Sequence, residues 1–246
     1  MTADEAPSLD GLAARFADQL TELTRGVLGR DSPRFHAVNM GNKVRVSPIR
    51  EDEVIQRIPV SINGEPVLSL LVRHDLCLDG SGTFLATDKA DIHLFYGRVA
   101  DPLLRYEYVR DSREPPGAHI QVHAHRDEMA YLLRLSEAGR PKRGLRNRKL
   151  PKLSEMHLPV GGHRMRPALE DVLLFLQREF AIDTAQGWRA VLDEHLCNWR
   201  DLQLKSAVRD NPEAAAEVLR LLGYQVRSPT VVAPRSDPDR NKLYWP

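Results

Sequence analysis

The chain has 246 residues, with 35 lysines and arginines against 34 aspartates and glutamates, so its formal net charge is only +1. This length can bury a full hydrophobic core, and the near balance of charge excludes a uniformly positive surface that would attract nucleic acid everywhere. No stretch approaches the roughly 18 apolar residues that cross a bilayer, and the first residues lack the features of a secretory signal. We therefore expect a cytoplasmic protein with no membrane partner.

The N-terminal part predicts one helix. From Leu9 to Val27, apolar residues recur at steps of three and four, which is the pattern of an amphipathic helix, and Ser8 can cap its start. Residues 33–47 show little periodicity, so we interpret them as a linker or an irregular crossing.

From Ile55 onward the hydrophobic period changes to two, which is typical of strands. Asn63-Gly64, the strongest short hairpin signal, separates the first two of them. Further turn signals lie at 79–82, 101–102 and 115–117. A short apolar run at 156–160 is expected to return to the sheet. Sequential strands joined by tight turns predict an antiparallel meander with one packed face and one available face.

The C-terminal part predicts three helices. Pro167 suits the first position of a helix whose first turn carries Glu170 and Asp171, where the helix dipole favours acidic groups. Further helices are expected over 188–202 and 211–223, followed by an extended tail.

These patterns together predict an α+β protein, in which a mostly antiparallel meander sheet is combined with an N-terminal helix and a C-terminal helical layer. The expected divisions are an N-terminal helix over 1–30, a sheet domain over 44–180, and C-terminal helices with an extended tail over 181–246.

The densest chemical signal is the segment 118–125, where histidine and glutamine alternate with small or apolar residues. As a strand, it would carry His119, Gln121, His123 and His125 on one face, while its other face packs into the core. Neighbours two apart lie about 7 Å from each other, so His123 and His125 can converge on one phosphate or one metal ion. The alternative is a polar strand face whose histidines hydrogen-bond across the sheet.

Gln121–Asp127 resembles the signature of the histidine triad nucleotide hydrolases, in which three histidines alternate with apolar residues and two apolar residues follow. Here Gln121 stands in place of the first histidine, and Arg126-Asp127 replaces the apolar ending. The resemblance covers seven residues. It implies that His123 attacks an α-phosphate and that His125 supports it.

A broader resemblance covers about residues 55–180. The order of strands, histidine strand, Gly-Gly turn and Arg-Pro-x-x-Glu-Asp helix is similar to uncharacterised bacterial proteins of toxin-antitoxin or phage-defence loci. That resemblance implies a nucleic-acid target and a protein partner such as an antitoxin. Such toxins often cleave RNA without a metal, using histidine and arginine.

The segment 157–167 forms a second constellation. Gly161 and Gly162 allow a ligand to approach the backbone closely, just before a helix N-terminus that favours an anion. Arg164 and Arg166 lie beside that helix end, where a bound phosphate would explain two guanidinium groups. The alternative is a tight turn whose arginines pair with nearby aspartates or glutamates.

A run of basic residues joins the histidine strand to this second constellation and is the local reason to consider nucleic acid, since each phosphate contact adds affinity without reading sequence. Its members are Arg140, Lys142, Arg143, Arg146, Arg148, Lys149 and Lys152. The alternative is an exposed, solvated loop.

The leading hypothesis is therefore a metal-independent enzyme that acts on phosphodiester bonds of RNA or DNA. His123 and His125 act as acid and base, His157 or His163 assists, and Arg164 and Arg166 hold the phosphate. This hypothesis requires His123 to lie near the two arginines.

Two alternatives remain open. One is a non-catalytic module that binds nucleic acid or a protein partner. The other is a zinc hydrolase in which His123 and His125 are ligands, with His157, His163 or His93 as the third. No motif indicates an organic cofactor.

Overall fold

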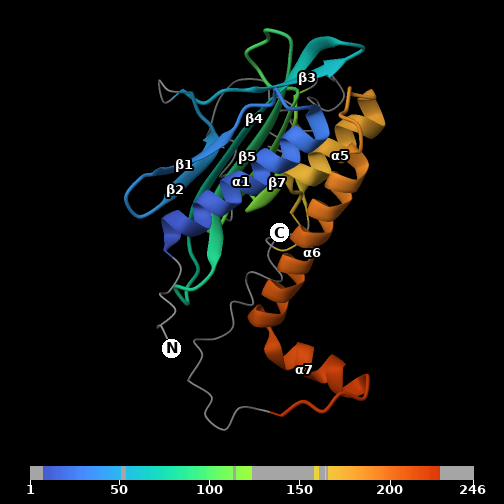
Figure 1. Cartoon of the computed structure of the whole chain (residues 1–246). Helices are drawn as coiled ribbons and strands as arrows, with labels where there is room; N and C mark the ends of the chain where they lie inside the picture. The colour runs from blue at the N-terminus through green and yellow to red at the C-terminus, as the bar shows by residue number, and fades with distance from the viewer. Residues whose placement is uncertain are drawn as a thin grey trace, which may run out of the picture.

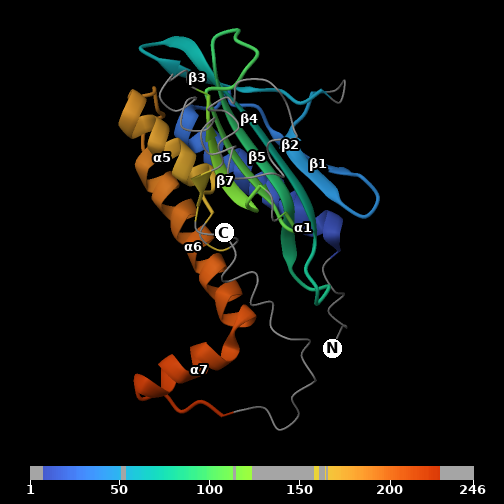
Figure 2. The ribbon, with the colours of Figure 1, turned by 180° about the vertical axis from the view of Figure 1, so that it is seen from behind.

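The computed structural model describes residues 8–50, 54–112, 115–123, 158–160, 164 and 166–227. In these ranges the chain is an α+β protein in which an antiparallel eight-stranded sheet has helices packed along one face (Figures 1 and 2). The predicted fold class is confirmed. Within the described ranges, no helix combines the length and apolar character needed to cross a membrane.

The first helix, α1 (Leu9–Leu28), forms as its periodicity predicts. The hydroxyl of Ser8 accepts a hydrogen bond from the backbone N–H of Gly11, which satisfies one of the free donors of the first turn. The buried stripe of α1 lies across the sheet, as Figure 1 shows. Gly26 allows α1 and α6 (Trp188–Asp210) to approach closely, because a Cβ atom there would lie 2.7 Å from Val191 Cγ1.

The expected linker at 33–47 is wrong, because this segment forms a hairpin of β1 (Phe35–Asn39) and β2 (Val44–Pro48). Its apolar residues are few, but Phe35, Val44 and Val46 are fully buried. Pairing of β2 with β4 (Glu65–Leu78) and contact with α1 stabilise a segment whose own pattern is weak.

The predicted hairpin at Asn63-Gly64 is confirmed. It joins β3 (Ile58–Ile62) to β4 (Glu65–Leu78), and both turn residues have the positive φ angles that such a turn requires. The carboxylate of Asp183 accepts hydrogen bonds from the backbone N–H groups of Asn63 at 3.1 Å and Gly64 at 2.7 Å. The turn is therefore tied to the segment that follows α5 (Leu169–Phe180).

The rest of the sheet is a meander that runs outward from β4. The successive strands are β5 (Leu85–Tyr96), β6 (Leu104–Val109), β7 (Ala118–Val122) and β8 (Leu158–Pro159). Each strand pairs antiparallel with the one before it. The predicted return of 156–160 to the sheet is thus confirmed at β8.

Strand register places two different rows of side chains on the two faces of the sheet. Val72, Ile92, Tyr106 and Ile120 are partners across β4 to β7 and face the helices. The next partners are Arg73, Asp91, Glu107 and His119, which side-chain alternation places on the opposite face. We call that second set the polar row.

The burial of β7 differs from the prediction that its histidine face would be the available one. His119 and Gln121 are 2% and 7% exposed, whereas Ile120 and Val122 are half-buried. The burial of His119 is tolerated because its Nδ1 atom donates to the carbonyl oxygen of Pro116 at 2.7 Å. The regular strand also ends at Val122, so His123 follows it.

The C-terminal helices are present, with two corrected boundaries. α5 begins at Leu169 rather than Pro167, because the carboxylate of Asp171 accepts from the N–H of Ala168 at 3.0 Å and fixes the cap there. α6 continues to Asp210, well past the predicted end near residue 202. α7 (Pro212–Leu221) follows directly and has no buried residue.

Candidate functional site

A groove of about 600 Å³ lies between the first half of α1, the tips of β4 and β5, and the second half of α6. Five arginines line it, together with the aromatic rings of Phe16, Phe84, Tyr108 and Trp199. The arginines are Arg15, Arg110, Arg164, Arg166 and Arg209. Among the described residues that line it, the carboxylates are those of Asp79 and Asp210. We call it the arginine groove.

Arg164 is fixed within the groove by Asp210, in the last turn of α6. Arg164 Nε lies 2.6 Å from Asp210 Oδ2, and its Nη2 lies 2.9 Å from Oδ1, which is the paired geometry that arginine and carboxylate favour. The sequence had suggested a bound phosphate or an acidic partner closer along the chain. The structure instead gives Arg164 a carboxylate 46 residues away.

Arg166 is half-buried at the inner end of the groove. Its guanidinium carbon lies 4.3 Å from the ring centre of Tyr108 and 5.1 Å from that of Trp199, and Nη2 lies 3.5 Å from the hydroxyl of Thr87. Burial lowers the pKa of Arg166 to about 10, so it still carries its charge at neutral pH. A permanent positive charge is therefore held between two aromatic rings.

The other three arginines lie along the more open part of the groove. Arg110 Nε donates to the carbonyl oxygen of Thr87 at 3.2 Å, and the guanidinium of Arg209 lies 4.2 Å from the ring centre of Phe84. Arg15 is exposed on α1. None of these three arginines forms an ion pair with another described residue.

A cavity of about 50 Å³ lies behind the groove and shares Phe16, Thr87, Tyr108, Arg166 and Trp199 with it. This volume can hold a few water molecules. His74 of β4 and Glu170 of α5 are among the titratable residues that line the cavity, and most of the other lining groups are apolar.

His74 is buried with neither ring nitrogen hydrogen-bonded within the described part of the chain. Its ring meets Phe16 edge-on, with the ring centres 5.2 Å apart. Burial, and then the nearby charge of Arg166, lower the pKa of His74 to about 4. His74 is therefore neutral at pH 7 and offers one donor and one acceptor to whatever enters the cavity.

The pKa of Glu170 is shifted in the opposite direction to that of His74. Burial, together with the neighbouring Asp171, raises the pKa of Glu170 to about 7. A carboxyl group with this pKa exchanges protons near neutral pH, which is the property of a general acid or base.

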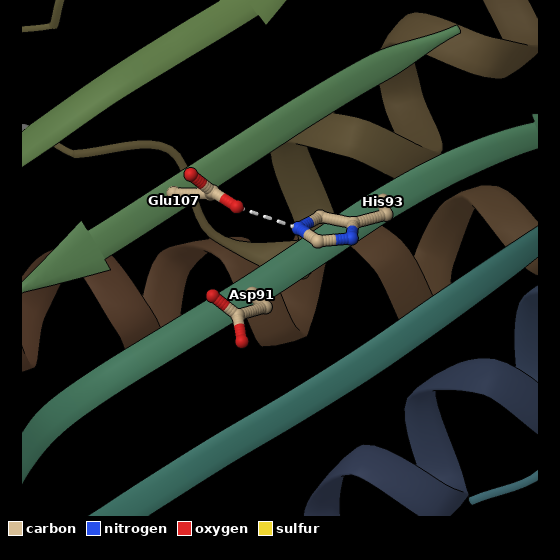
Figure 3. Close-up of side chains that lie close together, drawn as sticks. All are labelled: Asp91, His93 and Glu107. Carbon is tan, nitrogen blue, oxygen red and sulfur yellow. Dashed lines mark hydrogen bonds and ion pairs between the residues drawn. The ribbon is translucent and has the colours of Figure 1, made fainter. Parts of the chain in front are cut away.

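The polar row on the other face of the sheet forms a second cluster (Figure 3). Glu107 accepts at both oxygens, with His93 Nε2 2.9 Å from Oε1 and His119 Nε2 3.3 Å from Oε2. These hydrogen bonds hold the pKa of Glu107 far below its usual range. Asp91 pairs with Arg73 and, at 3.4 Å, with Lys89.

Asp91, His93 and Glu107 are the described residues whose arrangement could hold a metal ion. One potential ligand atom from each lies within 4.8 Å of the other two. Asp91 is 2% exposed, and its Oδ1 atom has no hydrogen-bond partner among the described residues.

The structure does not bring His123 together with Arg164 and Arg166. His123 lies at the end of β7, where burial and then the nearby Arg105 lower its pKa, and it also interacts with His93 and Glu107 on the polar face. Arg166 packs against Tyr108, whose partner on β7 is Ala118, five residues before His123. Five strand residues span about 16 Å, and the faces are opposite. The single-site hypothesis therefore needs correction.

Several predicted site residues lie outside the described ranges, and their assigned roles stay predictions. They are His125, His157, Gly161, Gly162, His163 and the basic run Arg140, Lys142, Arg143, Arg146, Arg148, Lys149 and Lys152.

Sequence reasoning missed most of the residues that the fold gathers in these two places. His74, Glu170, Arg110 and Arg209 have no shared motif, and only the packing of α1, α5 and α6 on the sheet brings them together. The polar row had one weak signal, since Arg73, Asp91 and Glu107 are charged residues directly beside apolar or aromatic ones in the sequence. Only the strand register shows that these charged residues lie beside one another on one face of the sheet.

No protein-family model matches the chain, and neither a curated protein nor a solved structure resembles it significantly.

Proposed function

We propose that the protein binds single-stranded nucleic acid in the arginine groove. The observation that carries this proposal is the meeting of five arginines and several aromatic rings, from separate elements, in one concave surface. Five arginines against two aspartates leave a formal excess of three positive charges, although the whole chain has only +1. The charge is concentrated where a polyanion would lie.

The distribution of side chains supports contact with both parts of a nucleotide. Arg15, Arg110 and Arg209 can contact phosphates, which strengthens binding without reading the sequence. Phe84 is 42% exposed and lies beside Arg209, so its ring is accessible for stacking. Alternation of arginine and aromatic groups is typical of surfaces that bind unpaired bases.

Single strands are favoured over duplexes for two reasons. Bases in a duplex are already stacked, so a ring such as Phe84 gains little from them. A concave site of about 600 Å³ also suits one or two nucleotides better than it suits the width of a double helix. Within this proposal, a toxin or defence role and an antitoxin-like partner remain predictions from the sequence resemblance.

Titration of a fluorescent 12-nucleotide RNA, with the matching DNA strand and a duplex as comparisons, tests the proposal by anisotropy. We expect saturable binding of the single strands that weakens as salt increases. For Arg209→Gln, loss of one phosphate contact should reduce the slope of log affinity against log salt by about 0.7.

The matched control is Arg178→Gln, which removes the same charge from an exposed position of α5 outside the groove. Its affinity and salt slope should equal those of the unmodified protein. If Arg209→Gln and Arg178→Gln behave alike, the groove is not the binding surface.

Cleavage of the bound strand is a second candidate, favoured by one observation. Glu170, with a pKa of about 7, lines the same cavity as the half-buried Arg166, so an acid-base group and a permanent cation lie close together. Degradation of labelled RNA by the purified protein tests it. Activity lost in Glu170→Gln and kept in His123→Ala supports cleavage here, whereas the reverse result would return the chemistry to the histidine strand.

A further inference from the structure

The polar face of the sheet carries a cluster that the nucleic-acid proposal does not use. We propose that Asp91, His93 and Glu107 bind a divalent transition-metal ion, with Zn²⁺ as the probe for its detection. Their potential ligand atoms lie within 4.8 Å of one another, and all three project from the paired strands β5 and β6 (Figure 3). Small side-chain rotations would bring them to metal-ligand distances of about 2 Å.

Strand geometry fixes the three positions. Asp91 and His93 are two residues apart on one strand, so they share a face, and Glu107 is the direct cross-strand partner of Asp91. Side chains attached to a paired sheet have little backbone freedom. The site would therefore be largely preorganised before an ion arrives.

The pairing of Asp91 with Glu107 places two carboxylates directly opposite each other, an arrangement that normally weakens strand pairing. Asp91 is also 2% exposed, and its Oδ1 atom has no hydrogen-bond partner within the described ranges. A buried carboxylate oxygen without a partner is costly. A cation between the two carboxylates removes both the repulsion and the unsatisfied oxygen.

The donor set indicates the class of metal. One imidazole nitrogen with two carboxylate oxygens suits Zn²⁺, Mn²⁺ or Fe²⁺, whereas Ca²⁺ and Mg²⁺ prefer oxygen alone. His119 Nε2 lies 3.3 Å from the second oxygen of Glu107, which is the kind of contact that orients a ligating carboxylate. The present contact between His93 and Glu107 would be exchanged for bonds to the ion.

Two positive side chains near Asp91 limit the affinity. Arg73 and Lys89 both pair with its Oδ2 atom, which leaves Oδ1 for the metal. Their charges repel a divalent cation, so the site should bind more weakly than a structural zinc site. Removal of the charge of Lys89, whose side chain is 38% exposed, should tighten binding several-fold.

Calorimetric titration of the chelator-treated full chain with Zn²⁺ tests the proposal. We expect one ion per chain and a rise in Tm on saturation, because an ion that binds only the folded state stabilises it. Asp91→Asn and His93→Gln should each weaken binding at least about tenfold. His36→Gln, at an exposed histidine of β1 outside the cluster, is the matched control and should bind as the unmodified chain does.

The Tm of each variant without metal shows whether it folds. His93→Gln keeps an amide that can donate to Glu107, so loss of metal binding in a folded His93→Gln variant supports the site. Absence of stoichiometric binding to the unmodified chain overturns the proposal. Zn²⁺ binding that is unchanged in both Asp91→Asn and His93→Gln would show that the ion binds elsewhere, and this also overturns the proposal. Unchanged or weaker binding in Lys89→Gln overturns it as well.

Discussion

Arg166 stacks on Tyr108, with its guanidinium carbon 4.3 Å from the centre of the phenol ring. This contact joins the segment before α5 to the middle of the sheet and forms one wall of both the arginine groove and the cavity behind it. The contact between the Arg166 guanidinium and the Tyr108 ring therefore helps to hold the segment before α5 against the sheet beside the candidate site.

Removal of this stack should destabilise the protein. We expect Arg166→Ala to lower the free energy of unfolding by about 2 kcal/mol or more, because contacts with two aromatic rings and buried packing are lost. Arg166→Lys should restore only part of this, since an ammonium group lacks the planar surface that stacks. Urea unfolding measures the difference. Arg178→Ala, at an exposed position, should stay within about 0.5 kcal/mol of the unmodified protein.

Glu170 should make stability fall as pH rises. Its folded pKa of about 7 lies above the usual value of 4.5, so the folded state holds the proton more tightly than the unfolded state between these values. The stability conferred by that proton is complete below about pH 4.5 and is lost as pH rises through 7, and the loss is about 3 kcal/mol.

Glu170→Gln should remove this dependence, so the variant should be more stable than the unmodified chain at pH 8 but not at pH 4.5. Urea unfolding at the two pH values measures the effect, with Glu194→Gln at an exposed site of α6 as the control. Equal pH profiles for Glu170→Gln and the unmodified protein would contradict the raised pKa.

His74 should make the folded state less stable as pH falls, which is the opposite of the effect of Glu170. Its folded pKa of about 4 lies below the usual 6.5, so the unfolded state binds the proton more readily between these values. Stability from the neutral ring is complete above pH 6.5 and is lost as pH falls through 4, by about 3 kcal/mol. Between about pH 4.5 and 6.5 the effects of His74 and Glu170 offset each other, and each becomes visible when the other is removed.

His74→Leu should therefore be at least as stable as the unmodified chain at pH 7 and more stable at pH 4, since it removes two unsatisfied nitrogens and a buried titratable group. Unfolding midpoints in urea at both pH values test this expectation. The exposed His36→Leu serves as the control, and a clear loss of stability in His74→Leu at pH 7 would show that the imidazole makes a favourable contact there.

Asp183 should stabilise the β3–β4 turn from a distance in sequence. Its carboxylate accepts from the N–H groups of both Asn63 and Gly64. Asp183→Ala should cost about 1 kcal/mol, which is modest because these hydrogen bonds are exposed. Asp31→Ala, also exposed, should change stability by less than about 0.5 kcal/mol, and equal effects of the two substitutions in chemical unfolding would exclude a specific role for Asp183.

Local patterns were sufficient to predict the elements with strong periodicity. The spacing from Leu9 to Val27 and the Asn63-Gly64 turn each predicted an element that the structure contains. β1 and β2 were missed because they are stabilised mainly by pairing with β4 and by contact with α1, which no local pattern encodes.

The candidate site was harder to predict for the same physical reason. The sequence placed Arg166 in a candidate phosphate-binding segment, but its neighbours Tyr108 and Trp199 come from 58 residues before it and 33 after it. His123 was grouped with it because the histidine strand, the basic run and the arginines all fall within residues 119–166. Side-chain alternation and the end of β7 at Val122 instead place His123 on the other face of the sheet.

The length of β4 also bears on how the protein avoids aggregation. One edge of this apolar strand is paired with β3 along its first half and with β2 near its end, from Ile58↔Leu70 to Val46↔His74. Only about three residues of that edge, 71–73, lie between the two pairings. Without the β1–β2 hairpin, the second half of β4 would present free backbone donors and acceptors to another chain. The hairpin, whose sequence signal is weak, thus covers part of one edge of the 14-residue strand β4.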